Sequence, residues 1–179
     1  MTLPNKLSIA RIFLVPVLVT VLLTRFSNLL ALSIFLLASL TDWLDGYIAR
    51  KSKQTTTLGK LLDPMADKLL ISSALISLVE MGLAPAWIVV VIVSREIAIT
   101  GIRSVAASQG VVIAASKMGK YKAVSEILAV SFLILDKFPF PVLGEIPLGR
   151  ILLWGAMIMA IISGVEYVIK FNREVKLTT

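Results

Sequence analysis

Long apolar segments separated by short polar ones dominate this sequence and limit the kind of fold that it can adopt. Hydrophobic residues make up 58% of the 179-residue chain, and charged residues make up only 16%. Several apolar segments approach the roughly 20 residues that an α-helix needs to cross a bilayer. We therefore predict an all-α integral membrane protein in which residues 1–179 form a single domain.

Six transmembrane helices fit these segments, with polar and proline-rich stretches as their connections. The first apolar segment has no A-x-A-like cleavage site followed by a soluble domain, so we expect a span rather than a cleaved signal peptide. Before it, residues 1–7 are expected to form a short N-terminal interfacial segment. The helices are expected over residues 8–24, 29–50, 58–81, 85–107, 118–135 and 148–171.

The basic residues predict how the spans are oriented. The formal net charge is +7, which in a membrane protein is explained by cytoplasmic loops and anionic lipid head groups, so we expect no nucleic-acid partner. With a cytoplasmic N-terminus, only Arg25, Lys137 and Arg150 of the 18 Lys and Arg residues fall on the far side. The sequence thus predicts a multi-pass protein of the cell (inner or plasma) membrane, with both termini in the cytoplasm.

Four of the five aspartates of the chain lie close together between residues 42 and 67. The segment reads D-W-L-D-G-Y-I-A-R, then eight residues, then G-K-L-L-D-P-M-A-D. The spacings place acids and small residues on one face of each of two antiparallel helices, at their cytoplasmic ends. These residues are Asp42, Asp45, Gly46 and Ala49 in the first helix, and Gly59, Asp63 and Asp67 in the second. Small residues on such a face let the two backbones, or a substrate, approach closely.

Four neighbouring carboxylates repel one another and need positive charge to compensate them. An all-oxygen site of this charge fits Mg²⁺, Mn²⁺ or Ca²⁺, and two such ions would neutralise the four acids. The chain has no cysteine and no histidine, which excludes thiolate nucleophiles, histidine bases and the usual zinc sites. Paired metals held by carboxylates often serve phosphoryl-type displacement. Because this site is expected at a membrane surface, the expected substrate is a lipid pyrophosphate. Two alternatives remain, namely aspartates at solvated helix ends and buried acids of an ion-translocating path.

The aspartate segment closely resembles the signature of the CDP-alcohol phosphotransferases. Its eight positions are all met, by Asp42, Asp45, Gly46, Ala49, Arg50, Gly59, Asp63 and Asp67. The opening L-P-N-K-L-S-I-A-R-I is similar to the start of that family, and S-R-E-I-A-I-T-G-I-R and S-K-M-G-K-Y-K resemble segments of its phosphatidylglycerophosphate synthase branch. The resemblance implies a six-helix membrane enzyme of phospholipid biosynthesis, usually a homodimer. It would transfer the phosphatidyl group of CDP-diacylglycerol to an alcohol and release CMP.

The same resemblance implies roles for individual residues. Two Mg²⁺ or Mn²⁺ ions would be held by Asp42, Asp45, Asp63 and Asp67. Asp67 would also be the general base that takes the proton of the acceptor hydroxyl as it attacks the β-phosphorus of CDP-diacylglycerol, on the cytoplasmic side. Arg50 would pair with the phosphates of that substrate. The positions expected to contact CDP-diacylglycerol are Asn5, Ser8, Gly46, Arg50, Thr56 and Gly59.

Basic residues after the aspartate segment predict an acceptor that carries a phosphate, with sn-glycerol 3-phosphate as the expected one. A buried arginine in a membrane helix normally faces a partner or a polar cavity. The predicted phosphate-binding residues are Arg95, Arg103, Lys117, Lys120 and Lys122. Two positions nearby depart from the pattern of the branch, with Ala123 where Thr is expected and Glu126 where Gln is common.

Each of these assignments has an alternative. The lysines also fit plain positive-inside charge, and Arg95 also fits a local pair with Glu96. A sister transferase acting on inositol phosphate, phosphatidylglycerol or serine would share the aspartate segment. An ion transporter is the competing hypothesis from a different functional class.

Overall fold

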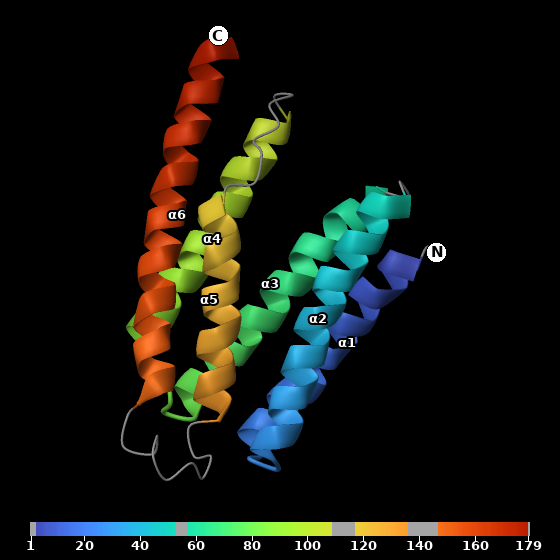
Figure 1. Ribbon diagram of the computed structural model, residues 1–179, viewed down its shortest axis with the longest axis vertical. Helices are drawn as coiled ribbons and strands as arrows, with labels where there is room; N and C mark the ends of the chain where they lie inside the picture. Colours follow the sequence, from blue (N-terminus) through green and yellow to red (C-terminus); the bar gives the residue numbers. More distant parts are fainter. Residues whose placement is uncertain (1–2, 53–56, 109–116, 136–146, 179) are drawn as a thin grey trace.

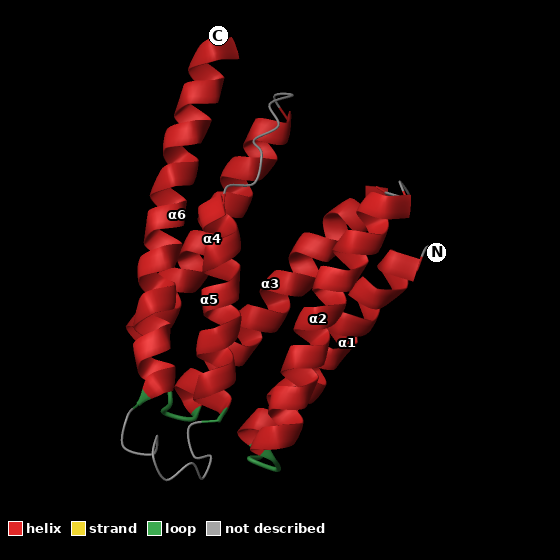
Figure 2. Cartoon of the chain, in the orientation of Figure 1, coloured by secondary structure: helices red, strands yellow, loops and turns green. Residues whose placement is uncertain are grey.

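The computed structural model describes residues 3–52, 57–108, 117–135 and 147–178. Within these ranges the side chains of residues 3–6, 42–52, 57–64, 117 and 175–178 are outside the description. The described chain forms six helices and no strand: α1 (Leu3–Leu23), α2 (Asn28–Ser52), α3 (Thr57–Glu80), α4 (Ala86–Ser108), α5 (Lys117–Ile134) and α6 (Leu148–Thr178) (Figure 2). The all-α prediction is confirmed, and most helix ends lie within two residues of the expected ones.

Two helix ends differ from the prediction. Residues 3–7 belong to α1 instead of forming a separate segment before it. Pro4 is compatible with this start, because the first turn of a helix leaves its N–H groups without intrahelical partners. At the other end α6 runs to Thr178 rather than 171. No Gly or Pro follows Phe171 to stop it, and Lys170 pairs with Glu166 one turn earlier at 2.7 Å.

The helices form two groups that meet along α3. In the first group α1 packs against α2 and α3, and in the second α6 packs against α4 and α5. Contacts of α3 with α4 and α5 join the groups, and α2 also contacts α5. Figure 1 shows the groups diverging toward the end of the molecule where both termini lie. One apolar core runs through both groups and includes Phe35, Leu75, Ile88, Leu133 and Leu153.

A tight turn between α3 and α4 reverses the chain and connects the two helix groups. Gly82 adopts a φ of 75°, which L-residues with a side chain rarely tolerate. Its N–H donates to the Val79 carbonyl at 2.9 Å, and that of Leu83 donates to the Leu78 carbonyl at 2.9 Å. This pair of bonds is a Schellman cap, which satisfies the last carbonyls of α3.

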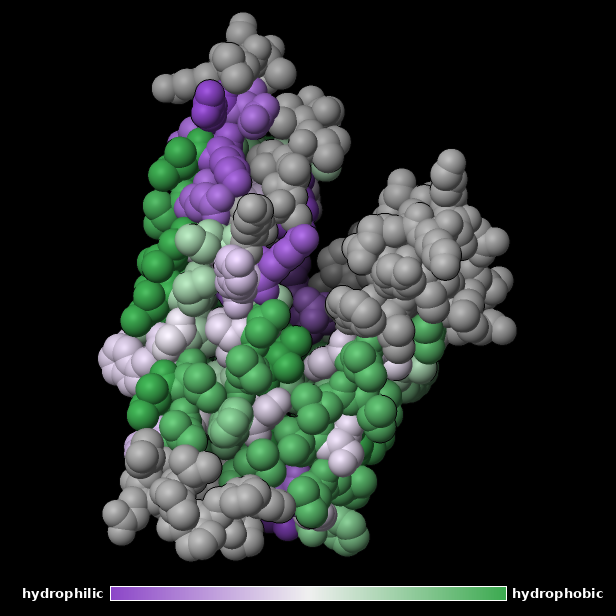
Figure 3. All heavy atoms as spheres, in the orientation of Figure 1, coloured by the Kyte–Doolittle hydropathy of each residue, from purple (hydrophilic) through white to green (hydrophobic). Residues whose placement is uncertain are grey.

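Apolar side chains cover the outside of the helices as well as the core, as the green areas of Figure 3 show. Each helix has a large apolar side chain that is more than half exposed, namely Phe13, Leu37, Ile76, Val90, Val124 and Ile169. By length and composition, one helix in the described ranges, over Leu148–Glu174, could cross a membrane, and Leu7–Leu23 and Asn28–Thr41 are shorter apolar helices. Six helices are therefore confirmed, whereas six membrane spans stay a prediction.

Candidate active site

Two helices in contact carry the four aspartates. Asp42 and Asp45 lie in α2, Asp63 and Asp67 lie in α3, and these helices pack against each other. The side chains of Asp42, Asp45 and Asp63 are outside the described residues. The structure therefore gives the surroundings of one predicted metal ligand, Asp67.

Most positions expected to contact CDP-diacylglycerol also fall outside the description. Thr56 lies in an undescribed range, and the side chains or surroundings of Asn5, Gly46, Arg50 and Gly59 are not described. Ser8 is described and is fully buried in α1. The nucleotide contacts thus stay predictions.

Asp67 lines a cavity at the junction of the two helix groups. The cavity is small, with a volume of about 30 Å³, and it is partly open to the solvent. Figure 3 shows hydrophilic residues gathered along the notch between the groups. The lining comes from three helices: Asp67, Lys68, Ile71, Ser72 and Leu75 of α3, Ile92, Val93 and Glu96 of α4, and Lys122, Ala123 and Glu126 of α5.

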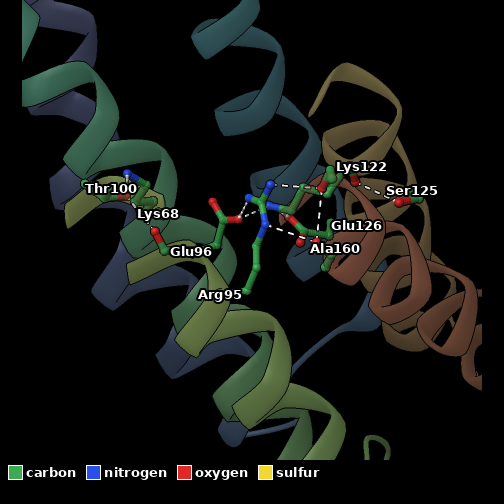
Figure 4. Close-up of polar contacts among 9 residues, drawn as sticks. Lys68, Arg95, Glu96, Thr100, Lys122, Ser125, Glu126 and Ala160 are labelled. Carbon is green, nitrogen blue, oxygen red and sulfur yellow. Dashed lines mark hydrogen bonds and ion pairs between the residues drawn. The ribbon is translucent and has the colours of Figure 1, made fainter. Parts of the chain in front are cut away.

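Lys122 bridges two acids in this cavity. Its Nζ lies 2.6 Å from Glu96 Oε1 and 2.6 Å from Glu126 Oε2, and the lysine side chain is only 7% exposed. Figure 4 shows the three side chains converging from α4 and α5. Buried charges are held in this way because each one needs a partner once it leaves water. Lys122, predicted to bind the acceptor, therefore lies beside Asp67 but is already paired.

Arg95 fixes the position of Glu96 from the other side. Its Nη1 donates to Glu96 Oε1, and its Nε and Nη2 donate to the Ala160 carbonyl at 3.2 Å and to Ser163 Oγ at 2.9 Å. Gly164 of α6 leaves room for the Arg95 side chain, since a Cβ at this position would lie 3.3 Å from Arg95 Cγ. The alternative expectation for Arg95, a local pair with Glu96, is confirmed.

Lys68 is a cavity residue that the sequence did not single out. Its Nζ donates to Thr100 Oγ1, and the Thr100 hydroxyl donates to the backbone carbonyl of Glu96 at 2.6 Å. Glu96 was expected only as a partner of Arg95, and Glu126 only as a departure from the family pattern. The sequence did contain a signal for these three residues, because a charged residue inside an apolar helix normally faces a polar partner.

The remaining predicted phosphate-binding residues lie apart from Lys122. Arg103 is exposed on α4, and its guanidinium carbon lies 5.6 Å from the ring centroid of Tyr167 on α6, a cation–π contact. Lys120 is exposed on α5, and the side chain of Lys117 is outside the description. The predicted basic set is thus divided between the cavity and the surface.

The chemistry of the predicted metal ligands fits a divalent ion. Among described side chains there is no group of three or more candidate ligands, since three of the four aspartate side chains are not described. The four positions nevertheless lie on two contacting helices and offer only carboxylate oxygens. Hard cations such as Mg²⁺ and Mn²⁺ prefer this set of ligands.

Comparison with known proteins identifies relatives along nearly the whole chain. Residues 1–162 match the family model described as CDP-alcohol phosphatidyltransferase. The chain is 45% identical to the CDP-diacylglycerol–glycerol-3-phosphate 3-phosphatidyltransferase of Bacillus subtilis, with 92% of each protein aligned. It is 38% identical to the protein of the same name from Rickettsia typhi (92% of this chain, 94% of the relative). It is 34% identical to a probable phosphatidylglycerophosphate synthase of Mycobacterium tuberculosis (97% and 83%).

These matches confirm the family predicted from the aspartate segment. They cover α1 to α5 and much of α6, including all four aspartates and every residue that lines the cavity. The chain belongs to the CDP-alcohol phosphatidyltransferase family.

Proposed function

We propose that this enzyme transfers the phosphatidyl group of CDP-diacylglycerol to sn-glycerol 3-phosphate, giving phosphatidylglycerophosphate and CMP. The observation that carries the proposal is the 45% identity, over 92% of both chains, to a relative named for these two substrates. The complete aspartate signature supports the same chemistry. The named relatives favour glycerol 3-phosphate over inositol phosphate, phosphatidylglycerol or serine as the acceptor.

In the proposed reaction the free primary hydroxyl of the acceptor attacks the β-phosphorus of CDP-diacylglycerol. A new phosphorus–oxygen bond forms, the bond from that phosphorus to the bridging oxygen breaks, and CMP leaves with the bridging oxygen. Asp67 takes the proton of the attacking hydroxyl, because the chain has no histidine and Asp67 lines a cavity that opens to solvent.

Two Mg²⁺ or Mn²⁺ ions are proposed to be held by Asp42, Asp45, Asp63 and Asp67. When bound, they would neutralise phosphate charge and make the acceptor hydroxyl easier to deprotonate. A count of bound Mn²⁺ on purified protein tests the site. We expect fewer ions on Asp63→Ala than on the unchanged protein, and equal counts would remove Asp63 from the ligand set.

The basic residues predicted to bind the acceptor are proposed to have different roles. Arg103, Lys117 and Lys120 bind the acceptor phosphate, while Lys122 lies deeper, between Glu96 and Glu126. Arg95 has its guanidinium committed to Glu96, Ala160 and Ser163, so we assign it a positioning role instead of a phosphate contact.

We further propose that the chain is a single domain with six spans in the cell membrane, its active site and termini facing the cytoplasm. Outward apolar side chains on all six described helices support the embedding. Both termini lie at one end of the molecule in Figure 1, as an even number of spans requires. Association into a homodimer is proposed from the family resemblance.

An acceptor panel tests the function. Purified protein would be incubated with CDP-diacylglycerol, Mg²⁺ or Mn²⁺, and in turn sn-glycerol 3-phosphate, inositol phosphate, phosphatidylglycerol or serine. We expect metal-dependent CMP release that is fastest with sn-glycerol 3-phosphate. Release only with another acceptor would overturn the proposed substrate, and no release with any acceptor would favour an ion transporter.

A further inference from the structure

Glu126 is a buried acid with one carboxylate oxygen that lacks a partner. Its side chain is 2% exposed, and its Oε2 accepts from Lys122 Nζ at 2.6 Å. Its Oε1 has no hydrogen-bond partner among the described residues. Buried polar atoms in folded proteins are nearly always satisfied, so this oxygen can accept a hydrogen bond that no described residue donates.

The unpartnered acid lies in the same cavity as Asp67. Both residues line it, Asp67 from α3 and Glu126 from α5. The two lysines that line it have partners of their own, Lys122 in Glu96 and Glu126, and Lys68 in Thr100. A molecule that brings a hydroxyl to Asp67 therefore enters a cavity that Glu126 also lines.

The charges around the cavity favour a neutral donor over a second phosphate. Counted as ionised, the ion pairs next to Glu126 balance, since Glu96 and Glu126 are matched by Lys122 and Arg95. A phosphate placed among them would add negative charge beside Glu126. An alcohol O–H adds none and donates the hydrogen bond that the carboxylate can accept.

We propose that Glu126 is a specificity-determining residue that accepts a hydrogen bond, through Oε1, from a second hydroxyl of the acceptor. This hydroxyl is the one on the carbon next to the attacking hydroxyl, so the cavity selects a vicinal diol. The inference rests on the proposed function and adds to it the part of the acceptor that is recognised inside the cavity. A site that bonds a substrate hydroxyl discriminates strongly against an analogue that lacks it.

Two acceptors that differ by this one hydroxyl test the proposal. The value of kcat/KM would be measured with sn-glycerol 3-phosphate and with 3-hydroxypropyl phosphate, which lacks the middle hydroxyl. The unchanged protein is expected to prefer the first by about 10- to 150-fold, the range for a hydrogen bond to a charged group. Glu126→Leu is expected to lose this preference, because its kcat/KM should fall for sn-glycerol 3-phosphate and stay unchanged for 3-hydroxypropyl phosphate.

Further variants control for folding and for charge. Glu126→Gln keeps the volume of the side chain and weakens the hydrogen bond. The preference of this variant for sn-glycerol 3-phosphate should therefore be about 3- to 10-fold lower than that of the unchanged protein. This variant tests the proposal if Glu126→Leu does not fold. Glu80→Leu makes the same change at an exposed position of α3 outside the cavity lining and should keep the full preference.

The contrary results separate this inference from the proposed function. Equal losses on both acceptors in the Glu126 variants, or no preference in the unchanged protein, would overturn the role of Glu126 and leave the proposed function standing. No CMP release from the unchanged protein with either acceptor would overturn the proposed function and this inference with it.

Discussion

At the scale of single residues, charged side chains in the described part of the cavity are held by polar partners. Lys122 bonds Glu96 and Glu126, Glu96 also bonds Arg95, and Lys68 bonds Thr100. Such pairing stabilises charge in an apolar molecule because each partner replaces the water that the other has lost. The electrostatic surroundings of Asp67 are thus set by residues from α3, α4 and α5.

The role of Asp67 gives the first prediction. Asp67→Asn keeps the size of the side chain but removes the proposed base, so we expect turnover to fall by at least about 10²- to 10⁴-fold while the protein stays folded. CMP release and thermal unfolding in detergent would be measured together. Asp136→Asn makes the same change outside the aspartate segment and should keep its activity. Near-normal turnover of Asp67→Asn would remove it as the base.

The residue-scale site could be predicted only where the sequence spacing itself determines it. The pair of Arg95 with Glu96, which are neighbours in the chain, is confirmed, and the site of the four aspartates stays a prediction. The partnership of Lys122 with Glu96 joins residues 26 positions apart on different helices. No periodicity within one helix specifies such a pair.

At the scale of helices, close packing between α5 and α6 depends on one glycine. A Cβ at Gly149 would lie 2.9 Å from the backbone nitrogen of Leu133, closer than real Cβ contacts. Gly155, further along α6, has no atom within 4 Å of such a Cβ. The two positions are therefore a matched pair on the same helix.

Replacing each of these glycines with alanine should affect the free energy of unfolding differently. Gly149→Ala forces the backbones apart and should lower the free energy of unfolding by about 1–3 kcal/mol. Gly155→Ala should leave it unchanged or raise it by up to about 1 kcal/mol, because alanine favours the helix. Thermal unfolding in detergent would report both. Similar Tm values for the two variants would contradict the observed packing.

The helices themselves were largely predictable, because apolar segments and turn residues determine where a helix can run. The start of α1 and the end of α6 were missed, since residues 3–7 and 172–178, which include polar ones, continue a helix as readily as they leave one. The contact at Gly149 was not predicted either. Small residues permit close packing wherever they occur, and the sequence does not say which helix will approach.

At the scale of the whole molecule, the cavity lies where the two helix groups meet. Asp67 comes from the first group, while Glu96 and Lys122 come from the second. The sequence alone could not predict this arrangement, because the apolar exterior gives every helix a similar pattern and leaves its partners undetermined. Joining the groups through α3 unites the aspartate segment with the later basic residues.

The proposed orientation can be tested because the chain has no cysteine. Single variants Lys53→Cys and Lys137→Cys would be expressed in cells and treated with a thiol reagent that cannot cross membranes. We expect Lys137→Cys to react in cells whose outer face is accessible, and Lys53→Cys to react only after the membrane is permeabilised. The reverse pattern, or equal labelling of both, would contradict six spans with cytoplasmic termini.

In the proposed reaction an acceptor hydroxyl attacks the lipid phosphorus of CDP-diacylglycerol and displaces CMP. Its most direct test uses sn-glycerol 3-phosphate with ¹⁸O in the primary hydroxyl, followed by mass spectrometry of both products. We predict that all of the label appears in phosphatidylglycerophosphate and that none appears in CMP. Label in CMP, or CMP formed without the labelled lipid, would contradict the account.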